Sequence, residues 1–267
     1  MHQVLMGSQR IEMPDDAPAD RPGYGRIEFD GLPNTRDLGG MVGADGKRIR
    51  PGVLLRSGLL GLASDADLRR LRDTYDLRLV VDLRNATELS EVPDPMDAFP
   101  QASYVHANIL RNEADGITQE AAARVAAAQR RAREANDPVV FMVDLYPHML
   151  LEDAGIEGYR AFFRALLACE EGAALWHCYV GRDRCGIASV LVESALGVPW
   201  GDIENDYLAT NLFAPRELTV DGPASLRSLG AAVAAVQREF GGLDGYIREG
   251  LGVTAGDVED LQARYLA

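Results

Sequence analysis

The sequence predicts an α/β protein whose central sheet is flanked by helices. Short apolar runs of strand length alternate with a helical stretch between residues 53 and 109. Strong helix formers then fill residues 118–170, and helical patterns dominate from residue 186 to the C-terminus. Strands that alternate with helices pack as a sheet covered by helices, so we expect that architecture.

Length and composition predict one folded domain behind a short lead-in. The chain has 267 residues, of which 47% are hydrophobic and 25% are charged, which is the balance of a globular protein with a large core. Residues 1–26 are rich in Pro, Asp and Gly without a period, so we expect a flexible lead-in there. Residues 27–267 are expected to form the single domain.

The net charge argues against a nucleic-acid partner, and the few cysteines argue against an oxidising compartment. The net charge is −14 and Lys47 is the only lysine, so no basic run offsets an acidic surface that repels polyanions. We therefore expect no nucleic-acid partner. No segment reaches the roughly 18 apolar residues of a membrane span, so we expect no stable membrane insertion. Three cysteines are too few for a disulfide framework, which predicts a cytoplasmic protein.

The first predicted elements follow from apolar runs and one helix cap. The segment "VLLRSG" (53–58) is a strand ended by glycine, and "LRLVVDLR" (77–84) is a buried strand that runs into charged residues. Between them, "SDADLRRLRDTY" (64–75) opens with a serine N-cap and repeats its leucines at helical spacing. The segment "SYVHANI" (103–109) predicts a further strand.

The middle of the chain predicts a helical insertion at about residues 116–170. A helix over residues 118–137 is ended by Pro138, and two further helices precede the strand "AALWH" (173–177). This is more helix than a crossover between two strands needs. The excess either forms a lid beside a site or covers one face of the sheet.

The turn "WHCYVGRDRCG" (176–186) joins that strand to a helix expected over "GIASVLVESALG" (186–197). A strand-to-helix connection directs several backbone N–H groups, and the positive end of the helix dipole, toward one point above the sheet. The turn therefore predicts an anion-binding site.

Cys178 and Arg184 indicate which anion this turn binds. Five residues separate the two, enough backbone to wrap around a tetrahedral phosphate, and Gly181 supplies a conformation that other residues resist. Arg184 adds a planar fork of donors. A cysteine at a helix N-terminus beside arginines is expected to be a thiolate, placed here for attack on phosphorus.

The turn resembles the signature loop of a known family. His-Cys-x5-Arg is the signature of the protein tyrosine phosphatase superfamily, and "HCYVGRDRCG" is similar to the "HCxxGKDRTG" loop of its bacterial branch of dual or triple specificity. Further blocks similar to that branch are "NTRDLGG" (34–40), "LLRSGLL" (54–60), "VVDLRNATE" (80–88), "DYLATN" (206–211) and "GLGVTAGDVEDLQARYL" (250–266). The resemblance implies a protein-tyrosine-phosphatase-like fold and hydrolysis of phosphate monoesters without a metal or organic cofactor.

The resemblance also implies a role for each residue of the loop. Cys178 is the expected nucleophile, which forms a phosphocysteine intermediate. The expected phosphate ligands are Tyr179, Val180, Gly181, Arg182 and Arg184. His177 is expected behind the loop, where it helps to keep the thiolate charged, and Gly186 opens the helix.

Two aspartates compete for the role of general acid. In the bacterial branch the aspartate inside the loop protonates the leaving oxygen, which implies Asp183 here. A carboxylate between two arginines is also typical of a structural ion pair. Asp82 ends a strand expected beside the catalytic one, so its carboxylate could reach the same crevice. Its alternative is a structural pair with Arg84.

The loop departs from the family pattern at two positions. Arg182 replaces a lysine, which keeps the positive charge and widens the donor. Cys185 replaces a threonine or serine whose hydroxyl helps to expel the cysteine from the phosphoenzyme. This change predicts slower hydrolysis of the intermediate, or a reversible disulfide with Cys178, or only a small buried residue in the same place.

The expected function is therefore hydrolysis of a phosphorylated protein or of a small phosphate ester. The resemblance implies phosphotyrosine, with phosphoserine, phosphothreonine or phosphoinositide as further substrates. A small metabolite, such as a nucleotide, sugar or inositol phosphate, is the alternative, because the helical insertion and Tyr179 could close over it. A phosphate-binding or redox-sensing module without turnover is a third hypothesis, favoured only by Cys185.

Overall fold

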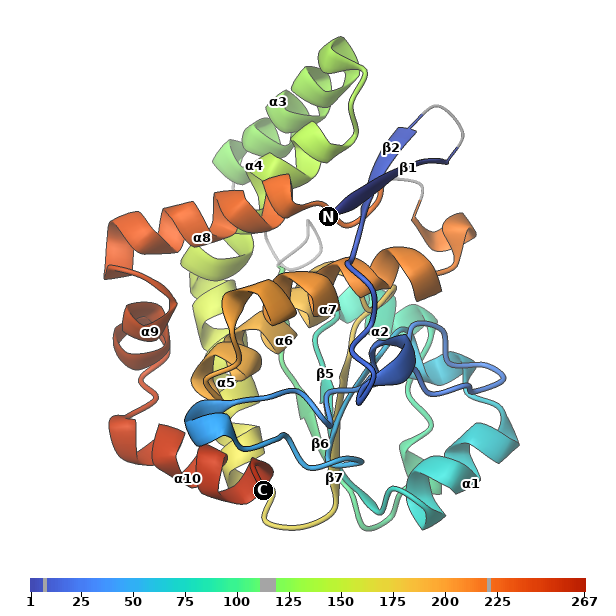
Figure 1. The fold of residues 1–267 in the computed structure, drawn as a ribbon. Helices are drawn as coiled ribbons and strands as arrows, with labels where there is room; N and C mark the ends of the chain where they lie inside the picture. Colours follow the sequence, from blue (N-terminus) through green and yellow to red (C-terminus); the bar gives the residue numbers. More distant parts are fainter. Residues whose placement is uncertain (7–8, 111–118, 220–221) are drawn as a thin grey trace.

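A five-stranded sheet organises the computed structural model, which describes residues 1–6, 9–110, 119–219 and 222–267 (Figure 1). In spatial order its strands are β3 (Arg36–Asp37), β4 (Leu54–Ser57), β7 (Ala173–His177), β5 (Leu77–Asp82) and β6 (Ser103–His106). Strands β4, β7, β5 and β6 run parallel, and β3 pairs antiparallel at one edge. The predicted α/β fold class is confirmed.

The strand β7 lies in the middle of the sheet because its sequence is apolar on both faces. All five of its residues are buried, as expected for a parallel strand that helices cover on both sides. Its last residue, His177, pairs with Ser57 on β4 and with Asp82 on β5. The carboxyl ends of three strands therefore meet at one edge, where ligands of parallel sheets bind.

Helices cover both faces of this sheet. Their bounds are α1 (Asp65–Asp73), α2 (Ala86–Glu91), α3 (Gln119–Ala135), α4 (Val139–Leu151), α5 (Asp153–Ala168), α6 (Asp183–Ala195), α7 (Trp200–Phe213), α8 (Leu226–Phe240), α9 (Leu243–Gly245) and α10 (Ala255–Tyr265). Single 3-10 turns lie at Pro22–Gly25, Ala44–Gly46, Leu60–Leu62, Met96–Ala98 and Arg216–Leu218, with a π-helical turn at Tyr246–Gly250. Within the described residues, none of the helices combines the length and apolar character that crossing a bilayer requires.

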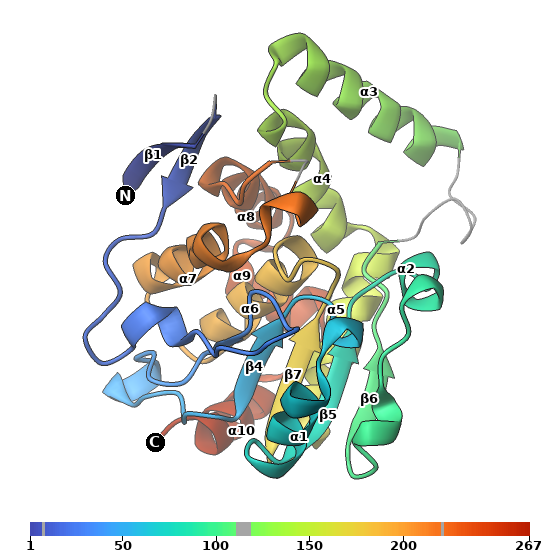
Figure 2. The same cartoon turned by 90° about the vertical axis from the view of Figure 1, so that its right-hand side faces the viewer.

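Alternate strand residues point into two cores. The larger core lies between the sheet and the layer of α5, α6 and α7, and the side chains that enter it from β5 and β7 include Leu79, Val81, Ala174 and Trp176. The smaller core lies under α1, and the strand side chains that enter it include Leu55, Val80, Ala173 and Leu175. Figure 2 shows α1 on the face opposite α6 and α7.

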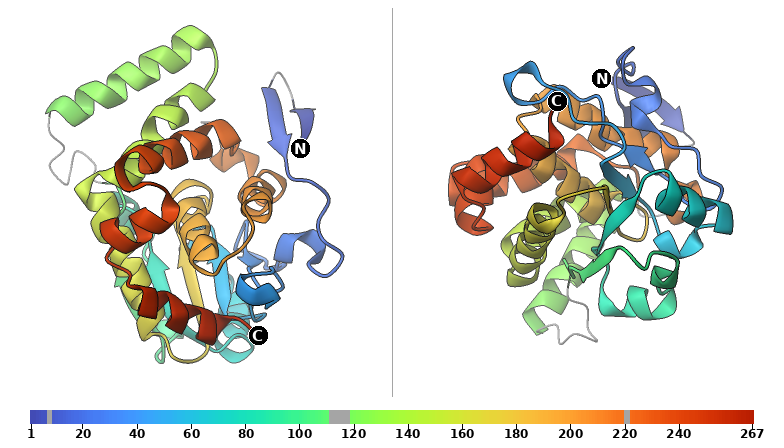
Figure 3. Two further views of the ribbon diagram at one scale, coloured as in Figure 1. Left: turned by 60° about the vertical axis from the view of Figure 1, so that its left-hand side comes forward. Right: turned by 90° about the horizontal axis from the view of Figure 1, so that it is seen from below.

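The C-terminal helices form an outer layer over the larger core. Helix α8 packs along α4, α9 packs on α6, and α10 packs on α5 and α6 (Figure 3). The last helix opens with a capping box in which Thr254 and Asp257 bond each other's backbone N–H groups. The sequence block at residues 250–266 therefore belongs to this outer layer and lies away from the loop after β7.

The N-terminal residues, where the composition predicts a flexible lead-in, contain two short strands. Strands β1 (His2–Met6) and β2 (Gln9–Met13) pair as an antiparallel hairpin (Figure 1). The carboxylate of Glu12 accepts hydrogen bonds from the Ser225 hydroxyl, at 3.1 Å, and from the Leu226 N–H, at 2.7 Å. The Asn211 amide donates to the Glu12 carbonyl at 2.7 Å. These long-range contacts hold the hairpin against α7 and α8.

The helices expected over residues 118–170 are present as α3, α4 and α5, while residues 116–118 lie outside the described chain. Helix α5 packs on β5 and β6, so it covers the sheet. Helix α4 packs along α8, and α3 folds back on α4 and extends away from the sheet (Figure 2). The insertion thus divides into a covering helix, α5, and an outer pair, α3 and α4.

Candidate active site

The turn after β7 lies at the carboxyl edge of the sheet, at the N-terminus of α6. The sequence predicts that this helix starts at Gly186, but it starts at Asp183. The first helical turn therefore includes Asp183 and Arg184. A carboxylate in the first turn is favourable because it meets the positive end of the helix dipole.

The backbone carbonyls of the loop are held away from its centre. The Asn34 amide donates to the carbonyl oxygens of Val180, at 3.3 Å, and of Gly181, at 3.0 Å. The Arg56 guanidinium donates to the same Gly181 oxygen at 2.9 Å. On the other side, the Gly181 N–H donates to the Sγ of Cys178 at 3.3 Å. The loop thus presents an N–H donor toward the thiol.

Only glycine fits at position 181. Its φ is +75°, in the region that L side chains avoid, and a Cβ there would lie 2.6 Å from the Ser57 carbonyl oxygen. The close approach brings the loop down onto the end of β4. Cys178 lies at the base of the loop with 2% of its surface exposed.

Arg184 is held by Glu88, a residue that the sequence analysis does not identify. The guanidinium donates to Oε2 at 2.5 Å and to Oε1 at 2.8 Å. Burial alone would lower the pKa of Arg184, but the hydrogen bonds to Glu88, together with the charges of Cys178, Glu88 and Asp183, raise that pKa. Glu88 is positioned by a capping box with Asn85 at the start of α2. The spacing Asn-x-x-Glu was the signal in the sequence.

Asp183 receives hydrogen bonds from two neighbours. The Tyr146 hydroxyl, on α4, donates to Oδ1 at 2.7 Å, and the Arg182 Nε lies 3.0 Å from both carboxylate oxygens. Tyr146 also shares a 2.7 Å hydrogen bond with the Tyr207 hydroxyl. The Asp183 side chain is 20% exposed, so it is both oriented and accessible. The outer helix pair therefore contacts the loop through Tyr146, which the sequence gives no signal to identify.

The Arg182 side chain is buried and hydrogen-bonded to its neighbours. Its side chain is 2% exposed, and its Nη1 donates to the Gly222 carbonyl while its Nε bonds Asp183. A guanidinium carries several N–H donors, so one side chain bonds both the Asp183 carboxylate and the Gly222 carbonyl. The phosphate contact that the sequence predicts for Arg182 stays a prediction.

Tyr179 and Val180 form the wall of the loop next to β4. The Leu59 N–H donates to the Tyr179 carbonyl at 3.2 Å, which ties the wall to the residues after β4. The Tyr179 side chain is partly exposed, whereas Val180 is 9% exposed. Of the two, Tyr179 is the side chain that can contact a substrate at the rim.

Cys185 and Gly186 pack inside the helix layer. The Cys185 thiol is fully buried and donates to the Trp176 carbonyl at 3.6 Å, and burial raises the pKa of Cys185 to about 12. A thiol with this pKa is a poor nucleophile at neutral pH. A Cβ at Gly186 would lie 3.2 Å from the Tyr207 ring, so glycine permits the close approach of α6 and α7.

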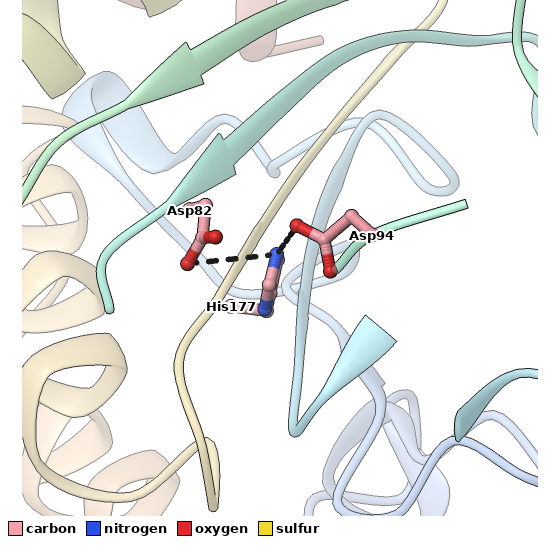
Figure 4. A group of neighbouring side chains, drawn as sticks. All are labelled: Asp82, Asp94 and His177. Carbon is pink, nitrogen blue, oxygen red and sulfur yellow. Dashed lines mark hydrogen bonds and ion pairs between the residues drawn. The ribbon is translucent and has the colours of Figure 1, made fainter. Parts of the chain in front are cut away.

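Behind the loop, His177 lies between two carboxylates (Figure 4). Its Nε2 is 2.9 Å from Oδ2 of Asp94 and 3.9 Å from Oδ1 of Asp82. The Asp82 carboxylate also accepts from Arg84 at 2.7 Å and from the Tyr104 hydroxyl at 2.9 Å. Burial alone would raise the pKa of Asp82, but Arg84 and His177 lower it. Asp82 is thus fully buried in an ion-pair network and does not line the loop.

This network has the side-chain types of a metal site, but the guanidinium of Arg84 already lies against its carboxylates. Among the described residues, one ligand atom each of Asp82, Asp94 and His177 lies within 4.8 Å of the others. The Arg84 guanidinium lies 2.7 Å from Asp82 and 3.0 Å from Asp94. Because the positive charge of Arg84 lies against both carboxylates, the group fits a buried ion-pair network better than a metal ion.

A second buried network brings three of the sequence blocks together. Asp206 on α7 accepts from Arg21 at 2.9 Å, from Arg36 at 3.3 Å and from Arg56 at 2.8 Å. Burial alone would raise the pKa of Asp206, but the three arginines lower it. Since Arg56 also holds the Gly181 carbonyl, the network supports the loop from behind. The blocks that contain Asn34, Arg56 and Asp206 are thus parts of one scaffold.

Comparison with known proteins agrees with this geometry. Residues 27–267 match the tyrosine phosphatase family. A Cupriavidus necator protein, provisionally named a tyrosine-protein phosphatase, is 33% identical over 272 residues, covering 94% of this chain and 93% of that protein. A triple specificity protein phosphatase of Mycobacterium tuberculosis is 27% identical, covering 83% of this chain and 92% of its own. A tyrosine-protein phosphatase of Nostoc commune is 23% identical, covering 79% and 74%. The chain therefore belongs to the tyrosine phosphatase family, whose members are phosphoric monoester hydrolases.

Proposed function

We propose that the protein hydrolyses phosphate monoesters through a phosphocysteine intermediate on Cys178, with phosphotyrosine as its principal substrate. The observation that carries this proposal is the form of the loop. Its carbonyls are held back by Asn34 and Arg56, while the Gly181 N–H faces the Sγ of Cys178 at 3.3 Å. Such a cradle stabilises both a thiolate and the oxygens of a bound phosphoryl group.

The first step transfers the phosphoryl group to the cysteine. The Sγ of Cys178 attacks phosphorus, an S–P bond forms, and the ester P–O bond breaks with its electron pair moving to the leaving oxygen. Asp183 donates a proton to that oxygen. Arg184, which Glu88 holds in place, neutralises charge on the phosphoryl oxygens.

The second step releases phosphate. Water attacks phosphorus, the Asp183 carboxylate accepts its proton, and the S–P bond breaks to return the thiolate. Because the Cys185 thiol bonds the Trp176 carbonyl, it does not supply the hydroxyl donor that the family pattern provides at this position. We therefore expect this second step to be the slower one.

The choice of Asp183 over Asp82 as general acid rests on position. Asp183 is 20% exposed at the first turn of α6, within the loop itself. Asp82 is fully buried, and its two oxygens already accept from Arg84 and Tyr104. A group without access to the leaving oxygen cannot protonate it.

Phosphotyrosine is proposed because the relatives are named for it and because Tyr179 offers a partly exposed aromatic ring at the rim. The triple specificity of one relative extends the proposal to phosphoserine and phosphothreonine as weaker substrates. Initial rates on a panel of tyrosine- and serine-phosphorylated peptides and of nucleotide, sugar and inositol phosphates test this choice. A metabolite hydrolysed faster than every peptide would contradict it.

The dependence of the hydrolysis rate on the leaving group tests the assignment of Asp183 as the general acid. An alkyl phosphate needs a protonated leaving group, whereas p-nitrophenyl phosphate does not. We expect Asp183→Asn to slow the alkyl ester by about 100-fold and p-nitrophenyl phosphate by less than about tenfold. Asp82→Asn is the comparison variant, and an equal loss on both esters is expected for it. The opposite pattern would reassign the acid to Asp82.

A further inference from the structure

Both ring nitrogens of His177 face atoms that can only accept hydrogen bonds. Nε2 lies 2.9 Å from the Asp94 carboxylate, and Nδ1 lies 3.3 Å from the carbonyl oxygen of Cys178. Neither a carboxylate nor a carbonyl oxygen carries a hydrogen. While Asp94 is ionised, the two hydrogen bonds can exist together only when both nitrogens are protonated, that is, when His177 is an imidazolium.

The charges around His177 lead to the same conclusion. Asp82 and Asp94 bring two negative charges, Arg84 brings one positive charge, and all three side chains are at most 1% exposed. A neutral His177 would leave one uncompensated negative charge in the interior, which is costly. An imidazolium at His177, itself fully buried, makes the group neutral.

Apart from the Cys178 thiolate that the proposed function places beside His177, the other groups near this network do not alter that count. From β6, the Tyr104 hydroxyl donates to Asp82, and burial, followed by the charge of Asp82, raises the pKa of Tyr104, so it stays neutral. His106, also on β6, contacts the Arg84 carbonyl at 2.8 Å through Nε2. The remaining neighbour is Cys178, the proposed nucleophile.

We infer that Asp94 is a positioning residue that keeps His177 an imidazolium, so that a fixed positive charge lies next to Cys178. This inference rests on the proposed function, in which the Cys178 thiolate is the nucleophile. Asp94 follows α2, the helix that carries Glu88. One segment of chain therefore holds both ends of the loop, with Glu88 on Arg184 and Asp94 on His177.

Asp94→Asn tests the inference with little change in volume. The amide oxygen can still accept from Nε2, but the negative charge is removed, so Asp82 and Arg84 balance each other and His177 loses its proton. Asp97→Asn is the matched control, because Asp97 is an exposed aspartate in the same segment and the change in net charge is identical.

Nitrogen-15 NMR of the imidazole rings gives a direct reading that does not depend on turnover. The chain has 4 histidines, and His177→Gln assigns the relevant resonances. We expect two protonated nitrogens on His177 at neutral pH in the wild type and in Asp97→Asn, and one in Asp94→Asn. A neutral His177 in the wild type would overturn the inference, even if Asp94→Asn failed to fold.

Alkylation of Cys178 by iodoacetamide gives the functional reading. A thiolate that loses a neighbouring positive charge becomes less populated at mildly acidic pH, so we expect alkylation of Asp94→Asn to be about tenfold slower at about pH 6. Equal rates in the wild type and Asp94→Asn would overturn the inference. Failure of the proposed function is recognised separately, as no phosphatase turnover in a wild type whose His177 is an imidazolium.

Discussion

Glu88 accepts two hydrogen bonds from the guanidinium of Arg184, at 2.5 and 2.8 Å, and so joins α2 to the first turn of α6. The pair is largely buried, with 19% and 11% of the two side chains exposed. A fork of this kind fixes the plane of the guanidinium before a substrate arrives. The orientation of the proposed phosphate clamp thus depends on a residue 96 positions away in the sequence.

Glu88→Gln is expected to lower kcat/KM by about 10- to 100-fold, because it removes charge-assisted hydrogen bonds worth about 1.5–3 kcal/mol. Steady-state kinetics on an aryl phosphate measure the change. Glu91→Gln, an exposed glutamate on the same helix, is the control and should keep the wild-type rate. A Glu88→Gln enzyme as fast as the control would show that Arg184 needs no such support.

Tyr146→Phe is expected to lower kcat by about tenfold on poor leaving groups, because the hydroxyl that orients Asp183 is lost. Tyr207→Phe is the matched control. It removes the hydrogen bond between the two tyrosines but leaves Tyr146 on Asp183. Rates for both variants on an alkyl phosphate separate the two contacts, and an equal loss in both would argue against a direct role of Tyr146 on the acid.

Asp206→Asn is expected to lower the free energy of unfolding by about 3–5 kcal/mol, because three buried arginines lose their shared counter-charge. Urea unfolding followed by circular dichroism measures the change. Glu204→Gln, a partly exposed residue on the same helix, should cost little. A small change at Asp206 would mean that the arginines are compensated elsewhere.

Glu193 predicts a dependence of stability on pH. It is fully buried on α6, and within the described residues neither carboxylate oxygen has a hydrogen-bond partner. Burial, reinforced by Asp206, raises the pKa of Glu193 well above its ordinary value. The folded protein therefore keeps a proton that the unfolded chain releases above about pH 4, so this residue costs stability as the pH rises.

Glu193→Gln removes that cost while keeping the shape of the side chain. We expect the free energy of unfolding of the variant, relative to the wild type, to increase between about pH 5 and about pH 8. Urea titrations at both pH values measure it. A difference that is the same at both pH values would mean that Glu193 does not change its protonation on unfolding.

Local patterns in the sequence were enough to predict β4, β5, β6 and β7, the helix after Ser64 and the loop around Cys178, but not β1, β2 or β3. Each of these depends on neighbours within a few residues, and the Ser64 capping box is one example. Contacts between distant segments were not predictable in this way. Tyr146, Glu88 and Asp94 reach the loop from 37, 96 and 83 residues away, and the N-terminal hairpin depends on the contact of Glu12 with α8. Such pairs are selected by tertiary packing, which periodicity does not record.

The start of α6 shows how a local pattern can also mislead. The apolar run after Gly186 predicts a helix that starts at this residue, yet the helix begins at Asp183. Asp183 and Arg184 are charged residues of the loop, so the apolar periodicity begins after the first residues of the helix. Sequence rules fail most often at functional positions, where residues serve chemistry before local structure.

The most direct test of covalent catalysis by Cys178 is hydrolysis of p-nitrophenyl phosphate by the wild type and by Cys178→Ser, with reductant present and with equal melting curves for both proteins. We expect turnover by the wild type and a loss of at least about a thousandfold in the variant, because a serine hydroxyl is not ionised at neutral pH. A folded Cys178→Ser protein within about tenfold of the wild-type rate would contradict covalent catalysis by Cys178.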